Sequence, residues 1–295
     1  MKRNIFLCCC TAIVLLCGCE KNITIKLKST EPKLVVEATI ENGQPPVVIL
    51  SQSLDYFSQI SPSVLENSFV HGAAVYISNG TLTHQLKEYK VPVSSGYNIY
   101  YYSIDSSNLA TAFAGQLNSQ YSLRIDWNGN EYTSATTIPK ITKKIDSLFW
   151  QQAPGNNDSS KVALMIIATD PPGYGDNIRY FTKRNSEPFY PGLTSVFDDQ
   201  IIDGSTYEVR IDRGVDRNSS RPDDYMFFYK GDTITLKLCN IDKATFDFWR
   251  TMEYSYASIG NPFSSPTQVL SNIKGNALGY FGGYAAQYRT IIVPK

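Results

Sequence analysis

The sequence contains few side chains of the kinds that usually carry out catalysis or bind metals. Among its 295 residues there are two histidines and six cysteines. His71 and His84 are the available imidazole bases, and neither lies in a His-Glu-x-x-His or Gly-x-Ser-x-Gly motif. We therefore expect both histidines at the surface or at an interface. We predict no catalytic residue, no metal ligand and no cofactor.

An excess of charge of either sign is also absent. Lysine and arginine total 27, aspartate and glutamate total 27, and the formal net charge is zero. A neutral chain lacks the broad positive field that attracts nucleic-acid phosphates, so we expect no nucleic-acid partner. Hydrophobic residues make up 42% and charged residues 18% of the chain, which is typical of a globular rather than a disordered protein.

The N-terminus has the order of a secretory signal. Lys2 and Arg3 precede an apolar run of 13 residues, Ile5–Cys17, which is shorter than the about 20 residues of a membrane-spanning helix. The segment Leu16–Cys19 resembles a bacterial lipobox, in which the signal is removed before the cysteine and the cysteine is acylated. We predict a lipoprotein signal peptide over residues 1–18, with Cys19 lipidated and residues 19–32 as the acylated cysteine and tether. An ordinary signal peptide with an incidental cysteine is the alternative.

Removal of the signal would change the count of cysteines. Cys19 and Cys239 would remain, and acylation of Cys19 would leave Cys239 as the one free thiol, so we predict no intramolecular disulfide. Two or more acyl chains on Cys19 would hold the protein stably at a membrane, because one chain alone binds only reversibly.

Residues 33–139 follow the alternating pattern of β-strands. Leu34, Val36, Ala38 and Ile40 share one strand face. Asn-Gly dipeptides, which favour the type I′ turns of hairpins, follow or separate alternating runs at residues 42–43, 79–80 and 128–129. About seven short strands in this span predict an immunoglobulin-like β-sandwich. Residues 56–69 are expected as a longer, helical excursion.

Residues 140–295 are predicted as a second β-rich domain with one packed α-helix. The helix is expected near residues 242–257, because Asp242 is a good N-cap, Ile241 and Phe246 suit a hydrophobic staple, and Phe246, Trp249, Met252 and Tyr256 form one apolar stripe. Cys239 alternates onto the strand face opposite Ile234, Leu236 and Leu238, and is expected to behave as a small hydrophobic residue. The fold class is therefore mainly β.

Several short motifs, in this order, resemble those of one known family. They are Cys19-Glu20-Lys21, Leu34–Ala38, Ile138-Pro139, Ile145–Ser147, Gly231-Asp232, Pro262–Pro266, Asn272–Gly275 and Gly279–Gly282. The resemblance is to domain of unknown function 4249, a lipoprotein family of Bacteroidota-type envelopes. It implies an outer-membrane lipoprotein, often encoded beside TonB-dependent receptors, with no established activity. Whether the protein faces the cell surface or the periplasm stays open, since the acidic cluster that favours surface display is reduced to Glu20.

Aspartates and glycines in the second half allow other interpretations. Loop carboxylates suit Ca²⁺, but their spacing does not match an EF-hand and solvated turns are the favoured explanation. They are Asp170, Asp176, Asp198, Asp199, Asp203, Asp212, Asp216, Asp223 and Asp224. A carboxylate-dependent hydrolase is an open, less favoured alternative. The glycine-rich stretches Gly173–Gly175 and Gly279–Tyr284 are expected as backbone turns.

Aromatic residues are the main surplus, with 20 tyrosines and 14 phenylalanines. Tyrosine has an apolar ring and a polar tip, which suits contact surfaces, although aromatics also fill sandwich cores. The candidate binding aromatics are Tyr97, Tyr100, Tyr101, Tyr102, Tyr280, Phe281, Tyr284 and Tyr288. The predicted function is a non-enzymatic binding or accessory module of unknown ligand, with an outer-membrane receptor as partner. A structural or adhesive envelope protein is the alternative.

Overall fold

The computed structural model describes residues 31–55, 58–93, 96–155, 157–219, 223–261, 263–265 and 267–295. The predicted signal peptide, Cys19 and all but the last two residues of the predicted tether lie outside these ranges. Residues Pro32–Lys295 form one compact unit. Strands dominate this unit, which confirms the mainly β fold class.

The main element is an eleven-stranded sheet with the order β11-β10-β14-β15-β1-β2-β5-β4-β3-β6-β7. Its strands from the first half of the chain are β1 (Leu34–Glu41), β2 (Val47–Gln52), β3 (Ala74–Ser78), β4 (Thr83–Pro92), β5 (Asn98–Ile104), β6 (Ser119–Trp127) and β7 (Asn130–Ile138). Its strands from the second half are β10 (Asn177–Arg184), β11 (Tyr190–Phe197), β14 (Thr233–Ile241) and β15 (Leu278–Ile292). One sheet therefore contains strands from both predicted domains.

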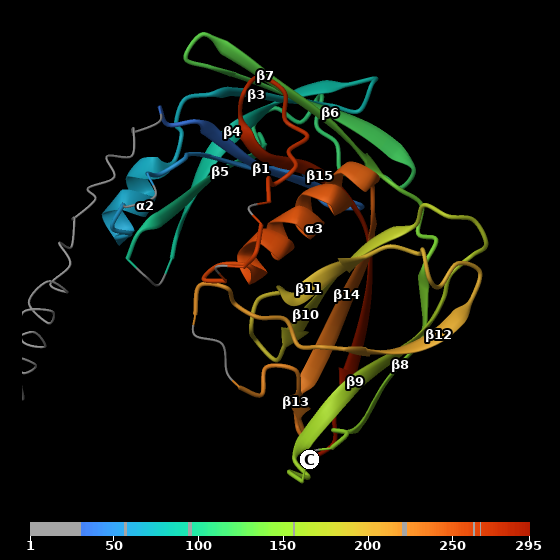
Figure 1. The fold of residues 1–295 in the computed structure, drawn as a ribbon. Coiled ribbons are helices and arrows are strands. Elements are labelled where there is room, and N and C mark those ends of the chain that lie inside the picture. The colour runs from blue at the N-terminus through green and yellow to red at the C-terminus, as the bar shows by residue number, and fades with distance from the viewer. Residues whose placement is uncertain are drawn as a thin grey trace, which may run out of the picture. The chain divides into compact units, whose positions relative to one another are not determined.

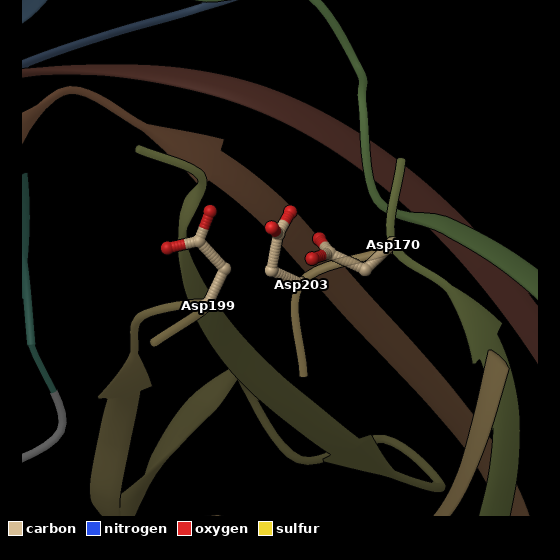
Figure 2. A group of neighbouring side chains, drawn as sticks. All are labelled: Asp170, Asp199 and Asp203. Carbon is tan, nitrogen blue, oxygen red and sulfur yellow. The ribbon is translucent and has the colours of Figure 1, made fainter. Parts of the chain in front are cut away.

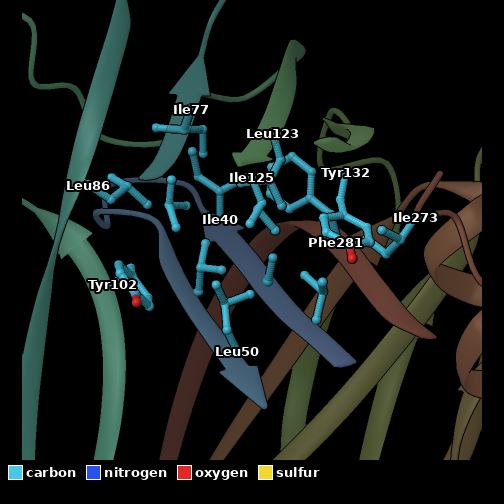
Figure 3. Close-up of a cluster of buried hydrophobic side chains, with 14 of the residues drawn as sticks. Ile40, Leu50, Ile77, Leu86, Tyr102, Leu123, Ile125, Tyr132, Ile273 and Phe281 are labelled. Carbon is cyan, nitrogen blue, oxygen red and sulfur yellow. The ribbon is translucent and has the colours of Figure 1, made fainter. Parts of the chain in front are cut away.

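The first core lies between the strands of the N-terminal half, which give a sandwich-like arrangement (Figure 3). Leu34, Val36, Ala38 and Ile40 alternate into it from β1, as the sequence predicts. Strand β7 is distant from β15 in the sheet order, yet the two pack together because the sheet rolls over this core. The predicted Asn-Gly hairpin turns join β3 to β4 and β6 to β7. At the second of these, Asn128 and Gly129 have φ angles of 48° and 74°, as a type I′ turn requires.

The second core lies between the large sheet and a smaller one (Figure 1). In the smaller sheet, β9 (Lys161–Thr169) pairs along one edge with β8 (Lys144–Gln152). Along its other edge it pairs with β12 (Thr206–Ile211) and β13 (Phe228–Tyr229). Ile234, Leu236 and Leu238 of β14 enter this core from the large sheet.

The third core is covered by the helix α3 (Lys243–Ala257) on the opposite face of the large sheet. Asp242 is its N-cap and accepts a hydrogen bond from the Thr245 amide at 2.8 Å, as predicted. Phe246 is buried and Trp249 and Met252 are partly buried in this core, but Tyr256 is 46% exposed, so its place in the predicted stripe is wrong. A short second helix, α2 (Pro62–Ser68), lies in the predicted excursion. Neither described helix has the length and apolarity needed to cross a bilayer.

Strand β15 corrects the prediction that Gly279–Tyr284 forms backbone turns. This segment belongs to a 15-residue strand that pairs in parallel with β1 and antiparallel with β14. A Cβ atom on Gly283 would lie 2.4 Å from the Thr137 carbonyl oxygen, and one on Gly279 would lie 1.9 Å from that of Val36. Glycine is needed because neighbouring backbone comes this close. The first core takes Ile273, Ala277, Phe281 and Ala285 from beyond the predicted division after residue 139, and the large sheet also continues across it.

Candidate functional site

Half of the predicted binding aromatics are core residues rather than surface residues. Phe281 is fully buried, and the exposed fractions of Tyr102, Tyr280 and Tyr284 are 2%, 3% and 5%. Tyr102 and Phe281 belong to the first core, and Tyr280 and Tyr284 to the third. The expectation of a contact surface at these four positions is wrong, because β15 is covered on both faces and the Tyr102 ring points into the first core.

The other four predicted aromatics are at least partly accessible. Tyr97, Tyr100 and Tyr101 are half-buried, and Tyr288 is 43% exposed. Tyr101 stacks on Tyr89, and Tyr100 meets the His71 ring edge-on with centroids 4.4 Å apart. Hydrogen bonds also hold the Tyr100 hydroxyl to Glu66 and the Tyr288 hydroxyl to Glu41. These contacts hold the rings of Tyr100, Tyr101 and Tyr288 in place against other parts of the protein.

A more exposed set of large apolar side chains lies at the C-terminal end of α3. Tyr254, Tyr256, Ile259 and Phe263 have exposed fractions of 53%, 46%, 76% and 94%. We call these four residues the α3-end surface. The sequence reasoning missed it because the predicted stripe placed Tyr256 inside. Glu253, about one turn earlier, takes the buried position, where it accepts hydrogen bonds from the Ser195 hydroxyl at 2.5 Å and from the Ser195 amide at 2.9 Å. The Tyr256 ring instead lies 5.6 Å from the Arg217 guanidinium at the edge of the helix.

A shallow polar pocket of about 430 Å³ lies at the turn between β6 and β7. It is lined by His71, Gly72, Asp126, Trp127, Asn128, Gly129, Asn130 and Glu131. His71 is therefore the one predicted imidazole candidate that reaches this pocket. Because a partly buried indole and several hydrogen-bonding groups meet here, the pocket suits a small polar ligand.

Glu88 holds His71 in place at the pocket. The His71 Nδ1 atom lies 2.5 Å from Glu88 Oε1, while Glu88 Oε2 accepts hydrogen bonds from the Gly72 amide and the Tyr102 hydroxyl, both at 3.2 Å. Burial raises the pKa of Glu88, but these hydrogen bonds outweigh it and the net pKa is lowered. Burial raises the pKa of the Tyr102 hydroxyl to about 12, so Tyr102 acts as a hydrogen-bond donor rather than as a nucleophile.

His84 is a core residue, which corrects the expectation of a surface or interface histidine. Its exposed fraction is 0%. Its Nδ1 atom lies 2.9 Å from the Thr111 hydroxyl, and its Nε2 accepts a hydrogen bond from the Asp105 amide at 3.1 Å. Burial lowers the pKa of His84, which favours the neutral ring that accepts at Nε2. Both ring nitrogens are thus used to join β4 to the loop after β5.

Three of the predicted loop carboxylates converge. Asp170 follows β9, and Asp199 and Asp203 lie in the turn after β11 (Figure 2). Each offers one oxygen atom such that these atoms all lie within 4.8 Å of one another. Asp170 and Asp199 are buried and Asp203 is partly exposed. Sequence reasoning named all three residues but could not bring them together, since 29 residues separate Asp170 from Asp199 in the chain.

Glycine-rich backbone positions two of these carboxylates. The Gly175 and Asp176 amides donate to Asp199 Oδ2 at 2.7 and 2.9 Å, and the Gly173 amide donates to Asp203 Oδ1 at 2.6 Å. The φ angles of Gly173 and Gly175 are 118° and 124°, which other residues rarely adopt. The prediction of a turn at Gly173–Gly175 is therefore confirmed, and the turn acts by presenting its amides to carboxylates.

Cys239 behaves as the sequence predicts. Its side chain is fully buried in the third core, on the face of β14 opposite Ile234, Leu236 and Leu238. Burial raises the pKa of the thiol to about 12, which opposes formation of a reactive thiolate. Cys239 is the free cysteine among the described residues.

With this geometry established, comparison with known protein families gives a match over most of the chain. A family profile described as "Domain of unknown function (DUF4249)" matches residues 20–290. The chain belongs to this family. A search of curated proteins finds no match. Membership in the DUF4249 family confirms the resemblance drawn from the ordered motifs, and it assigns no activity to the pocket, the carboxylates or the α3-end surface.

Proposed function

We propose that this DUF4249 protein is an outer-membrane lipoprotein whose folded unit is a non-enzymatic binding or accessory module. The observation that carries the proposal is the position of the family match, which begins at residue 20, directly after Cys19 of the lipobox-like segment Leu16–Cys19. Cleavage before Cys19 would leave the matched region as the mature protein with an acylated first residue. Acyl chains buried in the bilayer would then supply the anchor.

The proposed partner is an outer-membrane protein of a TonB-dependent uptake system, contacted through the α3-end surface. Tyr254, Tyr256, Ile259 and Phe263 expose apolar area within one ten-residue stretch. Aromatic residues of this kind are enriched at the energetic centres of protein interfaces. Helix α3, which carries Tyr254 and Tyr256 and ends shortly before Ile259, is held firmly. Its Glu253 accepts hydrogen bonds from Ser195 of β11 and pairs with Arg217 at 3.1 Å. A rigid support lowers the entropy lost on binding.

The anchor is tested by expressing full-length protein with Cys19 intact or changed, Cys19→Ala. Labelled palmitate should enter the wild-type band only, and the variant should leave the membrane fraction. Cys17→Ala is the matched control, since it changes a cysteine two residues earlier and should leave labelling intact. Acyl label in the Cys19→Ala band would contradict the proposed anchor.

The binding role is tested by co-purification from detergent-solubilised membranes. Phe263→Ala combined with Ile259→Ala should reduce recovery of the receptor at least tenfold, because loss of a hot-spot side chain costs about 2 kcal/mol or more of binding. Ile201→Ala and Leu109→Ala remove side chains with exposed fractions of 97% and 64% elsewhere on the protein and should bind normally. If folded α3-end variants recover as much receptor as these controls do, the α3-end surface is not the receptor-binding site.

A further inference from the structure

Asp170 is a buried carboxylate whose hydrogen-bonding capacity is unused. Its side chain is 0% exposed, and neither of its oxygens accepts a hydrogen bond. The nearest cation is the equally buried Lys143, whose Nζ lies 3.3 Å from Asp170 Oδ1 and likewise makes no hydrogen bond. Buried polar atoms almost always have partners, because leaving a buried charge unsatisfied costs several kcal/mol. The ammonium group alone therefore leaves this carboxylate incompletely satisfied.

The local charge balance is also incomplete. In their ionised forms Asp170, Asp199 and Asp203 would carry three negative charges and the nearby Asp176 a fourth, against one positive charge from Lys143. The hydroxyl of Thr142 and the amides of Gly175 and Asp176 are neutral donors, so they orient the carboxylates without cancelling their charge. Like charges buried together in a protein require protonation or a cation.

We propose that Asp170, Asp199 and Asp203 bind a divalent cation, Ca²⁺. The contacting atoms are hard carboxylate oxygens with no imidazole or thiolate among them, which favours Ca²⁺ or Mg²⁺ over zinc or copper. Their maximum separation of 4.8 Å is about twice a Ca²⁺–oxygen distance, so one ion can touch all three. Ca²⁺ tolerates irregular ligand arrangements, whereas Mg²⁺ demands a regular octahedron at shorter distances.

Backbone hydrogen bonds hold the proposed ligands ready for the ion. The Asp199 and Asp203 carboxylates are each fixed through one oxygen by amides of the 173–176 turn. The amide of Asp170 donates to the Ser205 carbonyl at 3.0 Å, which ties the end of β9 to the turn that carries the other two aspartates. The exposed Gly173 and Tyr174 border the cluster and place solvent within reach of it. The ion would link the end of β9 to the turn after β11.

The test is thermal unfolding of the full-length, detergent-solubilised protein after removal of metals with EDTA. Addition of calcium chloride should raise the wild-type Tm by about 5–10 °C when calcium is near 100 times its Kd. Asp203→Asn, which changes the most accessible ligand, should lose most of this shift. Asp212→Asn is the matched control, because Asp212 is a partly exposed aspartate in an ion pair with Arg210, and it should keep the full shift.

Two further measurements keep the proposal falsifiable if Asp203→Asn fails to fold. Terbium, a calcium substitute, should show tyrosine-sensitised luminescence on the wild type that calcium displaces. Lys143→Met should lower the Tm in EDTA and show a larger calcium shift than the wild type, because the competing ammonium charge is gone. The proposed Ca²⁺ site is overturned if folded wild type shows neither a Tm shift with calcium nor a terbium signal that calcium displaces. Lys143 would then be the counter-ion of the buried Asp170. Equal shifts with calcium and magnesium would overturn the assignment to Ca²⁺.

Discussion

Thr136 of β7 donates its hydroxyl hydrogen to Asp242 Oδ2 at 2.8 Å, although 106 residues separate the two in the chain. Asp242 uses its other oxygen to cap α3, so one carboxylate joins the helix to the rolled end of the sheet. The same Thr136 hydroxyl accepts a hydrogen bond from the Gly283 amide of β15 at 2.8 Å. Helix α3, edge strand β7 and central strand β15 thus meet at three linked hydrogen bonds.

Asp242→Ala should lower the free energy of unfolding by about 2–4 kcal/mol. The substitution removes an N-cap and also leaves the Thr136 hydroxyl and the Thr137 amide without their acceptor. Urea unfolding followed by tryptophan fluorescence measures the change. Asp247→Ala is the matched control on the same helix, where the carboxylate pairs with the exposed Lys243 and its loss should cost about 0.5 kcal/mol or less. Similar losses for both variants would contradict the bridging role of Asp242.

Gly283→Ala should destabilise the fold by more than 3 kcal/mol, because an added methyl group overlaps backbone that has no room to move. Its Cβ would lie 2.4 Å from the Thr137 oxygen and 2.8 Å from the Ile138 nitrogen. Gly72→Ala provides the comparison: φ there is 67° and nothing lies within 4 Å of the new atom, so backbone strain alone should cost about 1 kcal/mol. If Gly283→Ala unfolds at the same urea concentration as Gly72→Ala, close packing of β7 on β15 is not what requires the glycine.

Glu88 should make stability depend on pH at the acid end. Burial raises its pKa, but hydrogen bonds from His71, Gly72 and Tyr102 lower it further, so the folded pKa lies below the unfolded value. A lowered carboxylate pKa contributes stability that is present above the unfolded value of about 4.3 and is lost as pH falls through the folded pKa. Glu88→Gln should therefore be less stable than the wild type near neutral pH, and the difference should shrink below about pH 4.

Urea unfolding of wild type, Glu88→Gln and His71→Gln across this pH range measures the effect. His71→Gln should produce part of the change, since two of the three hydrogen-bond donors to Glu88 remain. A difference between wild type and Glu88→Gln that stays constant from neutral to acid pH would show that Glu88 is not held ionised by its partners.

Cys239 should resist alkylation in the folded protein. Burial raises the pKa of its thiol to about 12 and excludes reagent from the third core. Iodoacetamide at mildly alkaline pH should modify Cys239 only in step with global unfolding, as followed by mass spectrometry in increasing urea. Cys239→Ser identifies any label that arises elsewhere. Rapid stoichiometric labelling in the absence of urea would show that β14 and α3 open locally.

Local patterns in the sequence predicted much of the secondary structure correctly. Alternation placed Leu34 and Ile40 inward on β1, and Asn128-Gly129 set the turn between β6 and β7. Asp242 marked the first turn of α3 because a helix N-terminus needs an acceptor for its free amides, a requirement that depends only on nearby residues. Each of these features depends on residues within a few positions of one another.

Contacts between distant segments decided what the sequence alone left open or gave wrongly. The glycines of β15 resemble turn residues until β7 and β1 are packed against them, and Tyr280 and Phe281 resemble contact residues until both sheet faces are covered. Asp170 and Asp199 become neighbours only because β9 and β11 end at the same place. Composition, the alternation of apolar residues and the Asn-Gly turn dipeptides thus determined the β-rich class. Tertiary packing determined which tyrosines lie in the core and where the carboxylates meet. The physical reason is that burial and charge proximity depend on the partner segment, which no local pattern specifies.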